Sequence, residues 1–259
     1  MTSLDSDAGA SPAILTRADG ATIAYHKSPG KSPGVIFCTG FMSDMEGTKA
    51  LALEASCRAH GRAYVRFDYF GHGGSSGRFE DATIGRWKGD ALAVLDEVAE
   101  GRQVVVGSSL GGWIMVLVAR ERPQRVAGLV GVAPAADFTQ ELMWPAFSER
   151  DKRTLARDGV LYQPSQYGEE PYAITMGLIE EGREHLVLGG PLLISCPVRI
   201  LQGLEDPDVP WRHALELVDA LSSDDVTLTL VKGGDHRLSG AADIRRLSDT
   251  VEALCRQVG

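Results

Sequence analysis

A serine turn framed by two glycines constrains this chain more than any other feature of its sequence. The turn, Gly107–Gly111, reads Gly-Ser-Ser-Leu-Gly and directly follows the apolar run Val104–Val106. The residues Leu110–Arg122 are almost all apolar and stop before a proline, as in a buried helix. A strand that turns sharply into a helix around Ser109 exposes the serine hydroxyl at the end of the sheet. We expect both glycines to be required because neighbouring backbone passes close to this bend.

Apolar runs alternate with helical patterns along most of the chain. Continuous apolar strands joined through helices predict a mostly parallel sheet with helices on both faces, which is an α/β fold. An Asp-Gly turn inside residues 13–25 predicts a β-hairpin ahead of that sheet. The predicted strands are Val35–Cys38, Ala63–Phe67, Val104–Val106, Val126–Val132, Val198–Leu201 and Val226–Val231.

The segment 138–190 breaks this alternation. It contains charge clusters, turn residues and several aromatic side chains. We interpret it as an inserted helical cap, or lid, over the carboxyl edge of the sheet; an ordinary long excursion with its own small core is compatible with this. The predicted organisation is a flexible tail (1–12), an α/β core (13–137 and 191–259) and the cap (138–190).

An activated serine needs two partners, a general base and an acid that orients the base. Asp206 lies in the loop after the strand that ends at Leu201, at the carboxyl edge of the predicted sheet, and Asp208 in the same loop is the alternative. Of the six histidines, His236 is the candidate base. It follows the last predicted strand, lies in a glycine-rich loop and comes after the acid, which is the order Ser, Asp, His. We therefore predict Ser109, Asp206 and His236 as nucleophile, acid and base.

Two backbone N–H groups are expected to stabilise the negative oxygen that forms when the serine attacks a carbonyl. One belongs to Leu110, because it follows the serine at a helix N-terminus, where N–H groups lack partners within the helix. The other is expected from the loop after the strand Val35–Cys38. Phe41 is the first choice for this donor and Met42 the second.

Composition and motifs argue against several other classes of protein. The formal net charge of −9 disfavours nucleic-acid binding, and no apolar run reaches the roughly 18 residues that suggest an integral membrane segment. The first twelve residues lack the basic and apolar regions of a targeting signal, so we expect a cytoplasmic protein. The four cysteines lie far apart, and the loop Gly71–Gly77 lacks the spacing of a phosphate cradle. Neither a metal nor an organic cofactor is therefore expected.

From about residue 21 to the end, the chain resembles the α/β-hydrolase superfamily. A narrower resemblance is carried by five stretches, 30–37, 47–51, 66–69, 106–113 and 235–237. They resemble the mitochondrial palmitoyl-protein thioesterases of this superfamily, which are also described as acyl-glucuronide esterases. The resemblance implies a catalytic serine, aspartate and histidine at Ser109, Asp206 and His236. It also implies hydrolysis of fatty-acyl thioesters and carboxylic esters, with a small molecule or a lipidated protein as the acyl substrate.

The predicted cap resembles this family least, and it is the part expected to hold the acyl chain. There Trp144 and Phe147, together with Met42 of the oxyanion loop, are expected to contact the substrate. Thr39 stands where many hydrolases of this fold have histidine, which leaves the backbone donor after it intact. Alternatives on the same three residues are hydrolysis of a C–C bond and perhydrolysis, and a further alternative is a ligand receptor without catalytic activity.

Overall fold

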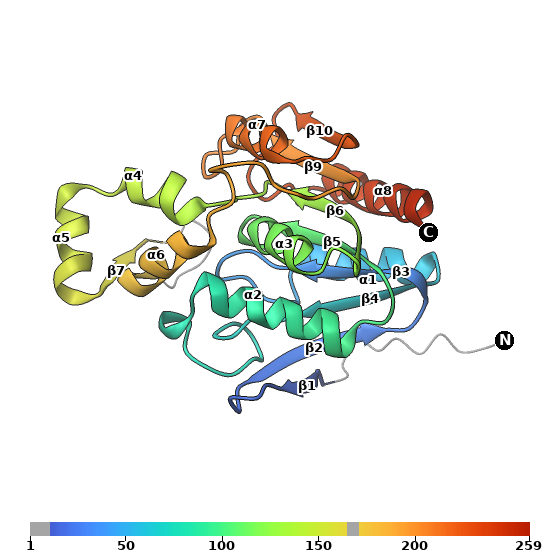
Figure 1. Cartoon of the computed structure of the whole chain (residues 1–259), viewed down its shortest axis with the longest axis horizontal. Helices are drawn as coiled ribbons and strands as arrows, with labels where there is room; N and C mark the ends of the chain where they lie inside the picture. Colours follow the sequence, from blue (N-terminus) through green and yellow to red (C-terminus); the bar gives the residue numbers. More distant parts are fainter. Residues whose placement is uncertain (1–10, 165–170) are drawn as a thin grey trace.

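The protein is described by a computed structural model that covers residues 11–164 and 171–259 (Figure 1). Residues 1–10 of the predicted tail and residues 165–170 of the predicted cap lie outside this description.

An eight-stranded sheet forms the centre of the molecule, in the order β1-β2-β4-β3-β5-β6-β9-β10. The six strands from β4 to β10 run parallel, and β1 and β2 form the predicted antiparallel hairpin at one edge. The mostly parallel sheet predicted from the sequence is thereby confirmed. The strands are β1 (Ala13–Thr16), β2 (Thr22–Ser28), β3 (Lys31–Cys38), β4 (Arg62–Phe67), β5 (Gln103–Ser108), β6 (Val126–Val132), β9 (Val198–Gly203) and β10 (Val226–Val231).

Helices cover both faces of the sheet and form two apolar cores (Figure 1). One core includes α1 and α8, and the other includes α2, α3 and α7. Strand β6 lies between the two cores, and every one of its residues is buried. This explains why its sequence is a continuous run of Val, Ala, Gly and Leu. The helices are α1 (Thr48–Ala59), α2 (Ile84–Ala93), α3 (Leu110–Glu121), α7 (Trp211–Ala220) and α8 (Ala241–Val258).

The chain between β6 and β9 leaves the sheet and forms a separate small unit on one side of it (Figure 1). This segment is not purely helical, because it also contains the antiparallel strand pair β7–β8. Its own small core includes Phe147, Leu155 and Ile174. The elements are η3 (Thr139–Met143), α4 (Trp144–Ala146), α5 (Glu149–Asp158), β7 (Val160–Gln163), β8 (Tyr172–Thr175), α6 (Met176–Gly182) and η4 (Arg183–His185).

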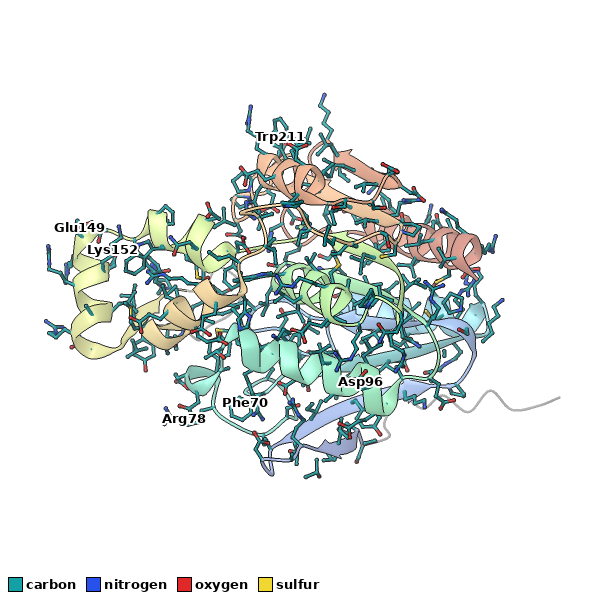
Figure 2. All side chains as sticks on the ribbon, in the orientation of Figure 1. Phe70, Arg78, Asp96, Glu149, Lys152 and Trp211 are labelled. Carbon is teal, nitrogen blue, oxygen red and sulfur yellow. The ribbon has the colours of Figure 1, made fainter. Side chains whose placement is uncertain are left out.

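Several polar contacts fasten this unit to the rest of the protein, among them a hydrogen bond of 3.1 Å from Trp113 Nε1 of α3 to the carbonyl oxygen of His185. The carboxylate of Asp137 accepts hydrogen bonds from the backbone N–H groups of Val187 and Leu188, which ties the two ends of the segment together. Glu181 of α6 accepts a hydrogen bond of 2.9 Å from the N–H of Gly85 in the first turn of α2. The charged residues Glu149 and Lys152 of α5 lie at the outer end of the unit (Figure 2). Among the described residues, no helix combines the length and the apolar character that crossing a bilayer requires.

Candidate active site

Ser109 occupies the sharp turn between β5 and α3. Its backbone φ of 53° lies in the left-handed region, which a residue with a side chain adopts only when its surroundings enforce it. A Cβ atom added at Gly107 would lie 2.1 Å from the carbonyl oxygen of Gly111, and one added at Gly111 would lie 2.1 Å from that of Cys38. These close backbone approaches explain the two glycines that frame the serine.

His236 lies in the loop between β10 and α8 and reaches the serine from there. Its Nε2 atom lies 3.0 Å from Ser109 Oγ, and its Nδ1 atom lies 2.9 Å from Asp206 Oδ2. A carboxylate can only accept, so Nδ1 donates to Asp206 and Nε2 is left to accept the serine proton. The structure therefore brings together all three residues that the sequence singled out.

Asp206 follows β9 directly after a short turn and is nearly inaccessible to solvent. Burial alone raises the pKa of its carboxyl group, but the hydrogen bond from His236 and those from two backbone N–H groups outweigh burial and hold the pKa below its usual value. The N–H groups are those of Asp208 (2.9 Å) and Val209 (2.8 Å), and Gln202 Nε2 adds a bond of 3.0 Å. Asp206 thus stays ionised and fixed in place, while Asp208 contributes its main chain to this support.

The side chains of Asp206, Asp208 and His236 have ligand atoms within 4.8 Å of one another, a spacing that a metal ion could use. Both oxygens of Asp206, however, accept hydrogen bonds from protein donors, and one of them fixes the imidazole ring. Such an arrangement is suited to moving a proton between Ser109 and His236. The geometry of the group therefore suits acid–base chemistry.

The expected oxyanion donors lie beside the serine. Gly40 packs against Ser109, since a Cβ atom added to Gly40 would lie 3.6 Å from the Cβ of Ser109. In the described part of the chain, the N–H groups of Phe41, Met42 and Leu110 have no hydrogen-bond partner within the protein. All three residues line the same cavity as Ser109. The arrangement therefore offers N–H groups from two loops to a negative oxygen near the serine hydroxyl.

A cavity of about 570 Å³ opens at Ser109 and His236. This volume falls within the ~300–1,000 Å³ of ordinary small-molecule sites. Of the residues expected to contact substrate, Met42 and Phe147 line it and Trp144 does not. The Trp144 ring instead contacts Phe147, with ring centroids 6.2 Å apart, and the charged groups of Lys152 and Arg183 each lie 5.4 Å from its centroid.

Other residues that line the cavity could not be predicted from the sequence. Apolar side chains come from the segment after β6, and polar side chains come from the loop before α1, the start of α1 and the loop that carries His236. The charged residue Lys49 donates a hydrogen bond of 2.6 Å to the carbonyl oxygen of Arg237, next to His236. Burial and the charge of Arg237 lower the pKa of Lys49 to about 8. The missed residues include Phe138, Leu142, Met143, Tyr172 and Ile174 on the apolar side, and Asp44, Thr48, Lys49 and Arg237 on the polar side.

Known proteins are similar to this chain in both sequence and fold. Residues 32–161 match a family described as serine aminopeptidase, S33. Over 244 residues the chain is 45% identical to the palmitoyl-protein thioesterase ABHD10, mitochondrial, of Bos taurus, and the match covers 93% of this chain and 79% of that protein. The chain belongs to the ABHD10 family of α/β hydrolases.

Two solved structures extend the likeness to the whole fold. The alpha/beta hydrolase domain-containing protein 10 from mouse superposes with a TM-score of 0.89 at 40% identity, over 96% of this chain and all of the other. A putative hydrolase from Agrobacterium vitis superposes with the same TM-score at 43% identity, over 93% of this chain and 96% of the other. Membership of the ABHD10 family makes the chain a hydrolase, which disfavours the alternative of a receptor without catalytic activity.

The same relatives correct the expected cytoplasmic location. The ABHD10 proteins of Bos taurus, Mus musculus and Homo sapiens are all named as mitochondrial. The expectation rested on the composition of the first twelve residues alone, of which residues 1–10 lie outside the described structure. Cellular location depends on recognition by transport machinery, which the composition of this short segment does not determine.

Proposed function

We propose that this ABHD10 family member is a serine hydrolase that cleaves acyl thioesters or carboxylic esters through an acyl-enzyme. The observation that carries the proposal is the continuous hydrogen-bonded path from Ser109 through His236 to Asp206, with donor–acceptor distances of 3.0 and 2.9 Å. The names of its relatives, palmitoyl-protein thioesterases, support fatty-acyl substrates.

The reaction follows from the positions of these three residues. His236 Nε2 accepts the proton of Ser109 as Oγ forms a bond to the acyl carbon, and the carbonyl oxygen takes the negative charge. When the tetrahedral intermediate collapses, the bond to the leaving group breaks and His236 protonates the departing thiol or alcohol. Water, deprotonated by His236, then attacks the acyl-enzyme and releases the carboxylic acid and Ser109. Asp206 keeps the ring in the required tautomer and stabilises its charged form.

The N–H groups of Phe41 and Leu110 are proposed as the oxyanion hole. Both residues line the cavity beside Ser109, and neither N–H group is used by another described residue. An N–H group that is already desolvated and oriented stabilises the transition state without reorganisation at the moment of reaction. Met42 is the alternative donor in the same turn.

The segment 138–190 is proposed as a cap that holds the acyl chain. Apolar side chains from this segment line the cavity that opens at Ser109, which suits a hydrocarbon chain. The cavity lining also includes Thr48, Lys49 and Arg237, whose polar side chains suit a polar leaving group. Lipidated proteins, small acyl thioesters and acyl-glucuronide-type esters all combine an apolar acyl part with a polar leaving group.

Labelling with a fluorophosphonate tests the proposal. The reagent phosphonylates an activated serine and loses fluoride, so wild type should be labelled and Ser109→Ala should not. Ser108→Ala is a matched control, because that serine is adjacent in sequence and it is the hydroxyl of Ser109 that lies 3.0 Å from His236 Nε2. Equal labelling of wild type and Ser109→Ala would refute the assignment of the nucleophile.

A series of acyl thioesters and oxygen esters of increasing chain length then addresses the substrate. We expect kcat/KM to rise with chain length until the apolar part of the cavity is filled, for thioesters and esters alike. Diketones and peracid formation serve as counter-screens for C–C hydrolysis and perhydrolysis. Faster turnover of these than of any ester would favour the alternative chemistry.

A further inference from the structure

The turn that carries the proposed oxyanion donors is strained. The N–H of Ser43 donates a hydrogen bond of 3.2 Å to the carbonyl oxygen of Gly40, which closes a tight turn around Phe41 and Met42. Met42 adopts a φ of 51°, a left-handed conformation that is unfavourable for a residue with a side chain. Such a conformation persists only when packing around it holds the turn in place.

The side chain of Phe41 supplies that packing. Its ring makes edge-on contacts with four aromatic rings from four separate parts of the chain. Edge-on geometry is the favoured arrangement for aromatic pairs and makes the ring position specific. The centroid distances are 4.9 Å to Phe79, 5.9 Å to Trp87, 5.8 Å to Phe138 and 5.7 Å to Tyr172.

Of these four rings, Tyr172 belongs to the β7–β8 pair in the segment proposed as the cap. Phe79 lies in the short helix η1 (Phe79–Asp81), Trp87 lies in α2, and Phe138 is the first residue of the same segment, directly before η3. The next two residues of β8, Ala173 and Ile174, are buried, and Ile174 belongs to the segment's own core, which fixes the strand. The β7–β8 pair is thus in contact with the loop that is proposed to stabilise the oxyanion.

We infer that Tyr172 is a positioning residue for the oxyanion hole. Its ring holds the ring of Phe41, which in turn holds the Phe41 N–H group beside Ser109. The cap segment would then contribute to the rate of acyl transfer itself, in addition to binding the acyl chain. This inference rests on the proposed function, because it assumes that Ser109 forms a tetrahedral intermediate.

A substrate with a short acyl group separates the two roles of Tyr172. Tyr172 lines the cavity, so a long acyl chain could contact it directly. An acetyl ester keeps the carbonyl chemistry and removes the chain that would occupy the cap. A trifluoromethyl ketone with an equally short chain forms a tetrahedral adduct with the serine, and its affinity reports on the oxyanion hole without turnover.

The variants are Tyr172→Ala, Tyr172→Phe and Tyr162→Ala. Tyr172→Ala removes one aromatic contact of Phe41. It should lower kcat for the acetyl ester about tenfold, with little change in KM, and weaken inhibition by the ketone about tenfold. Tyr172→Phe keeps the ring and should stay within about twofold of wild type. Tyr162 is 59% exposed on the neighbouring strand β7, which makes its alanine variant a matched control. Thermal melting of each variant shows that it is folded under the assay conditions.

A double-mutant cycle with Phe41→Leu tests whether Tyr172 acts through Phe41. That substitution keeps the backbone N–H group and removes the ring. If the two residues act through their contact, the double variant should lose clearly less activity than the product of the two single losses. Losses that multiply would overturn the inference, as would a folded Tyr172→Ala that hydrolyses the acetyl ester at the wild-type kcat. If wild type hydrolyses no ester and Ser109 is not labelled by a fluorophosphonate, it is the proposed function that fails.

Discussion

Gly111→Ala tests how strongly the serine turn depends on close backbone packing. A Cβ atom at this position would lie 2.1 Å from the carbonyl oxygen of Cys38 and 2.6 Å from that of Thr39. Both atoms belong to backbone at the end of β3, which leads directly into the oxyanion loop. No side chain can rotate away to relieve the clash, so either the start of α3 or this loop must move.

The size of the movement follows from the contact distances. Real Cβ contacts are essentially never shorter than 3.0 Å, so the two backbones must separate by roughly 1 Å. A misplacement of about 1 Å at a catalytic site can reduce the rate by about 10²-fold. We therefore expect Gly111→Ala to lower kcat for an ester by about 10²-fold and to lower the melting temperature.

Steady-state kinetics with one short ester and thermal denaturation measure both effects. Gly177→Ala is a matched control: Gly177 also lies in a helix, and a Cβ atom there would meet its nearest neighbour at 3.9 Å. Alanine is about 1 kcal/mol better than glycine in a helix, so this control should be neutral or slightly stabilising. If Gly111→Ala matches the wild-type kcat and melting temperature, the reasoning about the turn is wrong.

Substitutions at Asp206, at the buried His72 and at Lys49, which contacts the loop that carries His236, test other parts of the site and fold. Asp206→Asn should lower kcat by about 10⁴-fold in steady-state assays without unfolding the protein, because His236 loses the carboxylate that sets its tautomer. Burial lowers the pKa of His72 from 6.5 to about 4, so between pH 6.5 and pH 4 this histidine binds a proton in the unfolded chain but not in the folded chain. In denaturant titrations, the free energy of unfolding should therefore fall by roughly 3 kcal/mol as the pH is lowered from 6.5 to 4, and His72→Phe should not show this loss. Lys49→Met should lower kcat/KM about fivefold, because it removes the hydrogen bond to the carbonyl oxygen of Arg237. Wild type should also lose activity as the pH rises through about 8, where Lys49 loses its proton, and Lys49→Met should not show this loss.

The three catalytic candidates could be predicted because each lies in the turn or loop that follows a strand with a clear apolar pattern. Once the strands before Ser109, Asp206 and His236 are recognised, parallel pairing brings their carboxyl ends to one edge of the sheet. The predicted strands were too short where glycine or polar residues extend the pairing. Strand β3 was predicted as Val35–Cys38 but begins at Lys31.

The cap and the pocket could not be predicted to the same degree. Charge clusters and turn residues concealed the strands β7 and β8, which are only four residues long and depend on pairing with each other. Trp144 was expected at the cavity wall, but the direction of a side chain on the one-turn helix α4 is set by packing against Phe147 and Arg183. Tyr172 lies far from Phe41 in sequence, and no local pattern indicates their contact.

Acyl transfer to Ser109 is the central claim, and direct mass measurement of the intermediate tests it. Wild-type protein mixed with an activated p-nitrophenyl ester, quenched with acid within the first turnover and digested, should yield the peptide that contains Ser109 with the mass of one acyl group added. Ser109→Ala should release no burst of nitrophenol and carry no acyl group. A burst of product from wild type with the acyl group on any other residue would contradict the account.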